Sequence, residues 1–242
     1  MRYVDVVSWY TSTRSGQELT GPDMDTKLDI LRERILACRK CPRLYEYTRE
    51  VASTKVRRFR DQTYHGGPVP GFGDIRARLL IVGLAPAAHG ANRTGRMFTG
   101  DPSGDWLMKI LHKHGFASIP TSRSADDGLV LYDAFITAAA RCAPPKNRPT
   151  AAELRNCLPY LSQEFEILQN VQLVLCLGLV AYQAVCKTLN IPKRTFGHSR
   201  LSHHGNLHIL TSYHPSRQNT QTGRLTWEQW DDVFARSHSL LV

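Results

Sequence analysis

The sequence predicts an α/β fold, a three-layer α/β/α sandwich with a central four-stranded, mainly parallel sheet. Four short apolar runs are typical of strands buried on both faces, and helical patterns separate them. The apolar runs span 78–86, 129–140, 171–178 and 206–215. The helical patterns cover roughly 101–115, 150–169, 179–189 and 225–240. Because buried strands that alternate with helices pair in parallel through right-handed crossovers, we expect helices on both faces of the sheet.

The segments before the first strand are predicted to form a helix and a long loop. Residues 25–40 place Leu28, Leu31, Ile35 and Leu36 on one face, which indicates an amphipathic helix. Residues 48–74 are basic and become rich in glycine toward their end, which favours a functional loop. Residues 1–24 contain many turn formers and little periodicity. We therefore expect a loosely attached extension over 1–24 and a single domain over 25–242.

Composition and charge indicate a folded protein with a polyanionic partner. Apolar residues make up 42% of the 242-residue chain and charged residues 21%, which is typical of a globular protein rather than a disordered one. The net charge is +10, which favours contacts with phosphates. No apolar run is long enough to cross a membrane and the start of the chain lacks a secretory signal, so we expect a cytoplasmic protein.

The chemically distinctive stretches all follow predicted strands. They are GLAPAAHGANRTGRMFTGDPSG (83–104), ARCAPPKNRPT (140–150), LGLVAYQ (177–183) and SYHPSRQNTQTG (212–223). In a parallel sheet, ligands bind outside the carboxyl ends of the strands. We therefore expect one functional site at this edge.

Four of the six cysteines have a spacing suited to metal binding. Cys38 and Cys41 form a C-x-x-C pair, and Cys142 and Cys157 follow with fourteen residues between them. Four thiolates in this arrangement can hold a [4Fe–4S] cluster or a tetrahedral zinc ion. The uneven spacing and the neighbouring prolines favour the cluster, in a structural role that ties the first helix to the sheet. Cys176 and Cys186 lie among apolar residues and are predicted to pack in the core.

Taken together, the loop after the first strand, the loop after the last strand and the four cysteines resemble family 5 (type B) uracil-DNA glycosylases. The resemblance covers roughly residues 28–240. It implies the four-stranded α/β/α core of that superfamily and a DNA repair enzyme that flips a damaged base out of the duplex and hydrolyses its N-glycosidic bond, leaving an abasic site. It also implies DNA as the partner, and we expect a monomer associated with the nucleoid through its DNA.

The resemblance assigns the two residues that would contact the flipped base. Phe98 matches the aromatic residue that stacks on the base. His214 matches the histidine of the HPS loop, which would donate a hydrogen bond to O2 of the departing base and stabilise its negative charge. A neutral imidazole is sufficient for this role.

Residues next to His214 and in a basic loop are candidates for contacts with DNA. Ser216, together with the amides that open the following helix, can bind a phosphate. Arg217, Gln218 and Asn219 are candidates to fill the gap left by the flipped nucleotide. The run KVRRFR (55–60) resembles a loop that follows the DNA backbone, and Arg57 and Arg58 are its candidate phosphate contacts.

The sequence departs from the superfamily pattern where a carboxylate often orients the attacking water. Leu84 and Ala85 occupy that stretch, and neither can activate water. Asp74, in GFGD before the first strand, matches the acid implicated in type B enzymes. It would act on the water or on the sugar cation, unless it is only a turn residue.

A second departure follows the second strand. Related iron–sulfur glycosylases have an asparagine that reads uracil there, whereas this chain has Ala138, Ala139 and Ala140. Ala85 and Ala138 are therefore expected to line a permissive base pocket. Such a pocket would accept uracil and also hydroxymethyluracil, ethenocytosine and hypoxanthine.

Two other functions fit parts of the sequence. A non-catalytic iron–sulfur protein that binds nucleic acid would use the same charge and cysteines, but it leaves Phe98 and His214 unexplained. A nucleotide phosphohydrolase needs clustered carboxylates for Mg²⁺, and the loops offer only Asp74, Asp101 and Asp105. Asp101 and Asp105 are better placed to open a helix.

Overall fold

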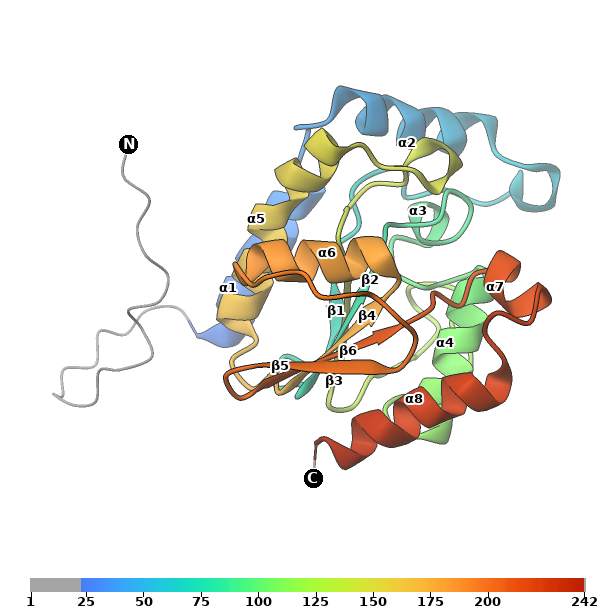
Figure 1. Ribbon diagram of the computed structural model, residues 1–242. Helices are drawn as coiled ribbons and strands as arrows, with labels where there is room; N and C mark the ends of the chain where they lie inside the picture. The colour runs from blue at the N-terminus through green and yellow to red at the C-terminus, as the bar shows by residue number, and fades with distance from the viewer. Residues whose placement is uncertain (1–22, 242) are drawn as a thin grey trace, which may run out of the picture.

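The computed structural model describes residues 23–241 as one α/β domain (Figure 1). The predicted extension over 1–24 lies almost entirely outside the described residues. The described part begins with Asp23, whose carboxylate accepts a hydrogen bond from the Thr26 amide and caps the first helix. No helix within 23–241 is long and apolar enough to span a bilayer.

The sheet has six strands in the order β1-β3-β2-β4-β6-β5. The four inner strands are parallel, as predicted: β2 (Leu79–Gly83), β3 (Ala134–Ala138), β4 (Leu173–Leu177) and β6 (Leu207–Ser212). Two antiparallel edge strands were not predicted, β1 (Phe72–Gly73) and β5 (Arg200–His204). Since the parallel strands point the same way, their carboxyl ends form a single edge.

Helices cover both faces of the sheet, which gives the predicted three layers (Figure 1). One face packs against α4 (Pro102–Lys113) and α8 (Trp227–Ser239). The other packs against α1 (Met24–Leu36), α5 (Ala151–Ile167) and α6 (Leu179–Thr188). Alternate residues of β2 enter the two cores, with Leu79 and Ile81 on the α4/α8 side and Leu80 and Val82 on the α5/α6 side.

The loop predicted over 48–74 is wrong in its first part. Helix α2 (Pro42–Thr54) extends through Thr54, and Leu44, Thr48 and Val51 form its buried face. Proline is favourable at the first position of a helix, because its missing N–H would have no partner there. The remaining residues of the loop include the short helix η2 (Arg57–Phe59).

The predicted strand over 129–140 is also too long. Only Ala134–Ala138 pairs within the sheet, whereas Leu131 forms an isolated bridge with Ala117. Three further short helices lie at the carboxyl edge or beyond it: α3 (Ala91–Thr94), η3 (Pro145–Asn147) and α7 (Arg217–Gln221).

Candidate active site

Phe98 lies in the loop that follows β2, and its ring covers the end of that strand. A Cβ added to Gly83, the last residue of β2, would come within 2.8 Å of the Phe98 ring. Only glycine therefore allows the ring to approach the strand so closely. The Phe98 side chain is 9% exposed, and its backbone has a φ of +50°. This left-handed conformation is rare for a bulky residue.

His214 follows β6 and stacks against Phe98. The centroids of the two rings are 5.8 Å apart and the ring planes are inclined by 29°. The structure thus brings the two predicted base contacts together, although 116 residues separate them in the chain. Removal of the imidazole from water lowers the His214 pKa from 6.5 to about 4. The imidazole is therefore neutral at physiological pH.

The two alanines predicted to line the base pocket lie at the carboxyl edge of the sheet. Ala138 ends β3 opposite Gly83 and belongs to the same buried cluster as Phe98. Ala85 is partly exposed in the loop after β2. The loops that follow β2 and β3 are joined by a hydrogen bond, which the Ala140 amide donates to the Leu84 carbonyl at 3.0 Å.

A buried polar network holds the residues on either side of Phe98. The Arg96 guanidinium contacts Thr99 Oγ1 at 3.0 Å, Ser122 Oγ at 2.8 Å and the Asp127 carboxylate at 2.7 Å. Burial alone would raise the pKa of Asp127, but hydrogen bonds from Arg96 and from nearby amides lower it. The pair therefore stays ionised at neutral pH and anchors the Phe98 loop.

The residues after His214 divide into structural and exposed ones. Ser216 caps α7 by accepting from the Asn219 amide at 3.4 Å, and Asn219 Nδ2 donates to the His214 carbonyl at 2.8 Å. Asn219 thus supports the backbone of the HPS loop in this structure, and its entry into DNA stays a prediction. Arg217 and Gln218 are exposed and remain the candidates for the gap left by a flipped nucleotide.

The basic loop reaches the same edge of the sheet. The Arg58 and Arg93 guanidiniums lie 4.3 Å and 4.0 Å from the centroid of the Phe59 ring. Since Arg93 is part of α3, which follows β2, these contacts attach the loop to the carboxyl edge. Arg57 and Arg58 are both exposed, as contacts with DNA require.

Asp74 does not join this site. Its amide donates to the Ala134 carbonyl, so it lies at the amino end of β3. The carboxyl end, Ala138, is four residues further on, or about 13 Å away. Both Asp74 carboxylate oxygens accept backbone amide hydrogens, from Arg76 at 2.8 Å and Asp133 at 3.0 Å. Asp74 therefore lies away from Phe98 and His214, and its amide contacts fit the alternative role in a turn. Its action on water or on the sugar stays a prediction.

Asp101 is a carboxylate on the carboxyl edge that the sequence analysis assigned only to the start of a helix. It does cap α4, because Oδ1 accepts from the Ser103 and Gly104 amides. Its other oxygen faces the loop after β2, where a Cβ on Gly90 would come within 2.2 Å of Oδ2. Burial raises the Asp101 pKa. The Gly90–Asp101 packing requires a tertiary contact, which the sequence alone did not reveal.

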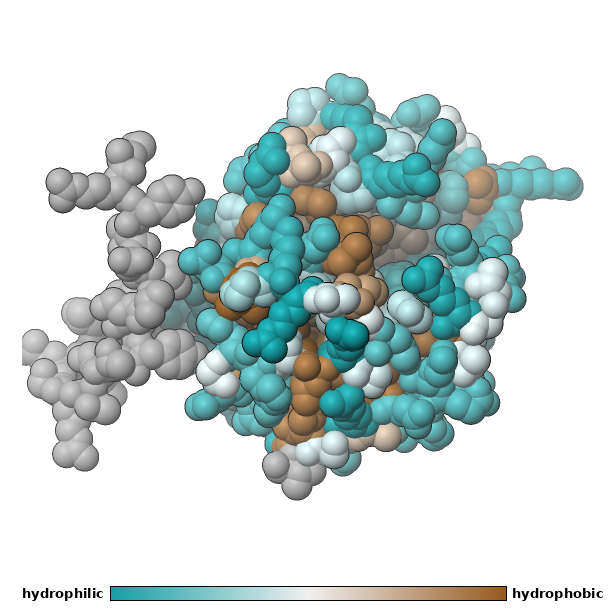
Figure 2. All heavy atoms as spheres, in the orientation of Figure 1, coloured by the Kyte–Doolittle hydropathy of each residue, from teal (hydrophilic) through white to brown (hydrophobic). Residues whose placement is uncertain are grey.

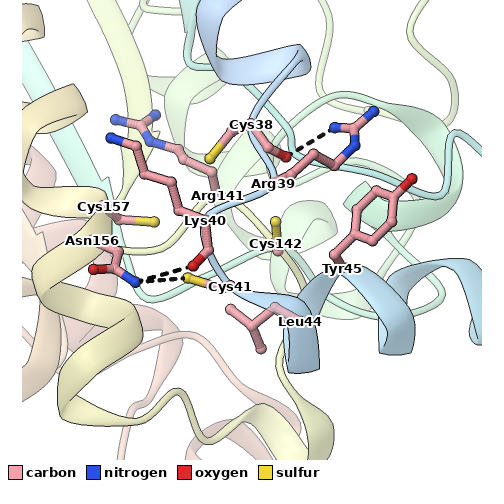
Figure 3. A pocket seen from close by; sticks show the side chains of 10 residues that line it. All are labelled: Cys38, Arg39, Lys40, Cys41, Leu44, Tyr45, Arg141, Cys142, Asn156 and Cys157. Atoms are coloured by element: carbon pink, nitrogen blue, oxygen red, sulfur yellow. Dashed lines mark hydrogen bonds between the residues drawn. The ribbon is translucent and has the colours of Figure 1, made fainter.

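The four predicted cysteine ligands line one cavity, with their sulfur atoms directed toward its interior (Figure 3). They come from four segments: the end of α1, the start of α2, the loop after β3, and α5. Asn156 Nδ2 donates to Cys41 Sγ at 3.4 Å, and the basic side chains Arg39, Lys40 and Arg141 also line the cavity. Burial, followed by the other three thiols, raises the pKa of Cys142 to about 12.

Within residues 23–241, no group of three or more histidine, cysteine, aspartate or glutamate side chains is close enough to hold a single metal ion. The four thiols instead surround a cavity. The group that these thiols hold stays a prediction. Of the three basic side chains at the cavity, Arg141 forms a buried ion pair with Glu164 of α5. Cys176 and Cys186 are buried elsewhere, in the α5/α6 core.

Comparisons with known proteins agree with this geometry. Residues 70–235 match the family model of the uracil DNA glycosylase superfamily. The chain is 48% identical over 211 residues to the type-5 uracil-DNA glycosylase of Mycobacterium bovis, covering 85% of this chain and 79% of the relative. It is 47% identical over 209 residues to the type-5 enzyme of Thermus thermophilus, covering 85% and 94%. The type-4 uracil-DNA glycosylase of Archaeoglobus fulgidus is more distant, at 32% identity over 163 residues, which cover 67% of this chain and 64% of the relative. The chain therefore belongs to the uracil-DNA glycosylase superfamily and, within it, to the type 5 family.

Proposed function

We propose that this protein removes uracil from DNA by hydrolysing the N-glycosidic bond and leaves an abasic site. The observation that carries the proposal is the contact between Phe98 and His214 at the carboxyl edge of the sheet. An aromatic face beside a neutral hydrogen-bond donor is the pair that an extrahelical pyrimidine requires. The net charge of +10 supports DNA as the partner.

The ring separation restricts how the base can bind. A base between two rings needs about 3.5 Å on each side, or about 7 Å in total. The centroids of Phe98 and His214 are only 5.8 Å apart. We infer that uracil stacks on Phe98 beside the imidazole, rather than between the two rings. The imidazole edge then faces the rim of the base, where O2 lies.

The neutral imidazole supports the chemistry of base departure. Cleavage of the bond between C1′ and the base nitrogen moves the bonding electron pair onto the base, which leaves as an anion. An N–H of His214 donated to O2 stabilises this anion more than it stabilises the neutral bound base. Water then adds its oxygen to C1′ and releases a proton. A charged histidine is not required, in agreement with a pKa of about 4.

We infer that Asp101, and not Asp74, supplies the carboxylate for the attacking water. Asp101 lies against the loop that follows β2, on the same edge as Phe98. Its Oδ1 is used in capping α4, while Oδ2 packs against Gly90 of the loop after β2 and forms no side-chain hydrogen bond within residues 23–241. In this proposal the base departs before water adds to C1′. Asp101 therefore needs to orient the water and does not need to activate it strongly.

The alanines at the pocket support a broad range of bases. Ala138 offers a methyl group where an amide would reward uracil and penalise other bases. We therefore propose that hydroxymethyluracil, ethenocytosine and hypoxanthine are also excised. Excision of uracil alone from a panel of duplexes that each carry one of these bases would contradict the permissive pocket.

We also propose that Cys38, Cys41, Cys142 and Cys157 hold a [4Fe–4S] cluster. When bound, the cluster supplies a covalent cross-link between α1, α2, β3 and α5 and takes no part in base excision. Such binding adds directly to the free energy of folding. The arrangement of the four thiols and the three basic side chains around their cavity supports this proposal. Zinc remains the alternative.

The test of function is incubation with a duplex that contains one uracil, followed by hot alkali. We expect strand scission only after alkali, which indicates an abasic product without lyase activity. The His214→Ala variant should be about 10²- to 10³-fold slower, the usual effect of removing one donor to a developing anion. Specific binding without release of any base would instead favour the non-catalytic alternative.

A further inference from the structure

A second cavity lies beside the active site and has no role in the scheme above. Its volume is about 160 Å³, and it opens between α6, the segment 190–199 and the antiparallel pair β5–β6. Since a water molecule occupies about 30 Å³ of the liquid, the cavity has room for a phosphate group. Its lining residues are Tyr182, Arg194, Thr195, Arg200, Leu201, Ser202 and Thr211.

The charged side chains that line this cavity are both arginines. Arg194 and Arg200 are exposed, and neither forms an ion pair with a carboxylate within residues 23–241. No aspartate or glutamate occurs in α6, in 190–204 or in β6, the segments that form the walls. Arg200 makes only a long hydrogen bond, from Nη1 to the Thr195 carbonyl at 3.5 Å. Two guanidiniums without a carboxylate partner within residues 23–241 favour binding of a phosphate, which they can contact through paired hydrogen bonds.

The walls of the cavity are held in place by hydrogen bonds. Thr211 Oγ1 donates to the Gly197 carbonyl at 2.6 Å, and the Arg194 amide donates to the Tyr182 hydroxyl at 3.0 Å. A Cβ on Gly197 would come within 2.9 Å of the Arg200 side chain, so the guanidinium arm packs directly on that glycine. The basic segment is thus attached to both α6 and β6.

The cavity lies within reach of the strand that holds the flipped base. Thr211 in its wall precedes His214 by three residues, or about 10 Å of extended chain. Tyr182 of the wall connects through Phe196 to Tyr213, with ring centroids 6.3 Å apart at each step. Successive nucleotides of one strand rise by 3.4 Å, so 10 Å corresponds to about three nucleotides. The face that carries α6 and the β5–β6 pair is mostly hydrophilic, with its apolar residues in a narrow band (Figure 2).

We propose that this cavity binds one backbone phosphate of the damaged strand, within about three nucleotides of the flipped base, through Arg194 and Arg200. The inference rests on the proposed glycosylase function and extends the DNA-binding surface from the HPS loop to the β5–β6 edge. The recognised group is a phosphodiester, so the contact is independent of sequence.

The first experiment measures the affinity for a duplex with a tetrahydrofuran abasic site as a function of salt. Loss of one phosphate contact lowers the slope of log K against log[salt] by about 0.9, so the affinity of Arg194→Gln/Arg200→Gln should change about 3.5-fold less between 50 and 200 mM salt. Arg76→Gln is the matched control, because Arg76 is exposed at the amino end of β2. The control should keep the wild-type slope. An unchanged slope in the double variant overturns the proposal.

The second experiment locates the phosphate and separates its possible sources. Single methylphosphonates, which are uncharged, are placed at each of three positions on either side of uracil. We expect one position to weaken wild-type binding but to have no further effect in the double variant, and the absence of such a position overturns the proposal. If inorganic phosphate stabilises the wild type against heat through these arginines without competing with DNA, the cavity binds a free anion and the proposal is also overturned.

These outcomes are distinct from failure of the proposed function. If the wild type releases no base from any duplex, the glycosylase assignment fails whatever the salt slopes are. If the wild type excises uracil and the double variant keeps both its slope and its sensitivity to every methylphosphonate, only the phosphate contact fails.

Discussion

Phe98 adopts a left-handed backbone conformation, which costs a bulky residue about 1–3 kcal/mol and persists only where neighbouring contacts enforce it. Those contacts come from Arg96 on one side of Phe98 and Thr99 on the other, both joined to Ser122. Asp127 completes the network through Arg96. The aromatic platform is therefore held in place by buried polar groups that do not contact the base.

We predict that Asp127→Asn weakens this hold and lowers kcat/KM for uracil excision about tenfold, which corresponds to 1.4 kcal/mol of transition-state stabilisation. The charge that pairs with Arg96 is lost, so the Phe98 loop can relax toward an ordinary backbone conformation. Asp126→Asn is the control, since Asp126 is exposed next to it and makes no contact with Arg96 through a hydrogen bond. Equal rates for the two variants in steady-state assays would contradict a positioning role.

The carboxylates of Asp101 and Asp74 give a second prediction about single residues. Asp101→Asn keeps a residue that can cap α4, so the fold should be retained while the single-turnover rate falls at least tenfold. Asp74→Asn should lower the melting temperature, because its two amide contacts weaken, and leave the rate within about twofold of wild type. The reverse pattern, with the rate lost in Asp74→Asn, would restore Asp74 as the acting acid.

Strands β2, β3 and β4 could be predicted from the sequence because every residue in them is buried and most are apolar. In β6 only the last four residues are buried. Edge strands lack this signal. Strand β5, Arg200–His204, is polar and largely exposed, and β1 has only two residues. Helix α2 did carry a signal, since Leu44, Thr48 and Val51 recur at helical spacing, but its charged residues made it resemble a loop.

In the candidate site, too, some features could be predicted from the sequence and others could not. His214 and Phe98 could be placed together because both follow parallel strands, and the carboxyl ends of such strands meet at one edge. The position of Asp74 was available from the same rule, because a residue that precedes a strand lies at its amino end. The use of Asn219 as a support for the His214 backbone depends on the conformation of α7, which no residue pattern revealed.

At the scale of this loop, we predict that Asn219→Ala lowers the single-turnover rate about tenfold while the affinity for abasic DNA changes little. The His214 carbonyl loses its side-chain donor, so the imidazole is no longer held against Phe98. Gln218→Ala is the neighbouring control. Gln218 is exposed and is a candidate for the DNA gap, so its loss should weaken DNA binding more than it slows the chemical step. A normal rate in Asn219→Ala would remove its positioning role.

For the whole molecule, the cysteine cavity lies where the end of α1, the start of α2, the loop after β3 and α5 meet. Arg141 lines the cavity and forms a buried pair with Glu164 of α5 at 2.6 Å, and Glu164 also accepts from Thr137 of β3 at 2.7 Å. Breaking such a pair costs about 3–5 kcal/mol. The cavity thus joins the helices at the start of the chain to the strand that carries Ala138.

We predict that Cys38→Ala protein loses iron and the visible absorption of a [4Fe–4S] cluster, and that its melting temperature falls. Cys186→Ala is the matched control, because Cys186 is buried in the core away from the cavity and should leave iron content unchanged. Iron content is measured by elemental analysis of the purified proteins. Wild-type protein with one zinc and no iron would replace the cluster by the zinc alternative, and iron retained in Cys38→Ala would remove Cys38 as a ligand.

The central claim is that His214 stabilises the base as it leaves as an anion. It is tested by single-turnover excision of uracil and 5-fluorouracil by wild type and His214→Ala. 5-Fluorouracil is the more stable anion, so it needs less help from a hydrogen bond. We predict that the loss of rate in His214→Ala is at least several-fold smaller for 5-fluorouracil than for uracil. An equal loss for both bases would show that His214 does not act on the leaving group, and would contradict the claim.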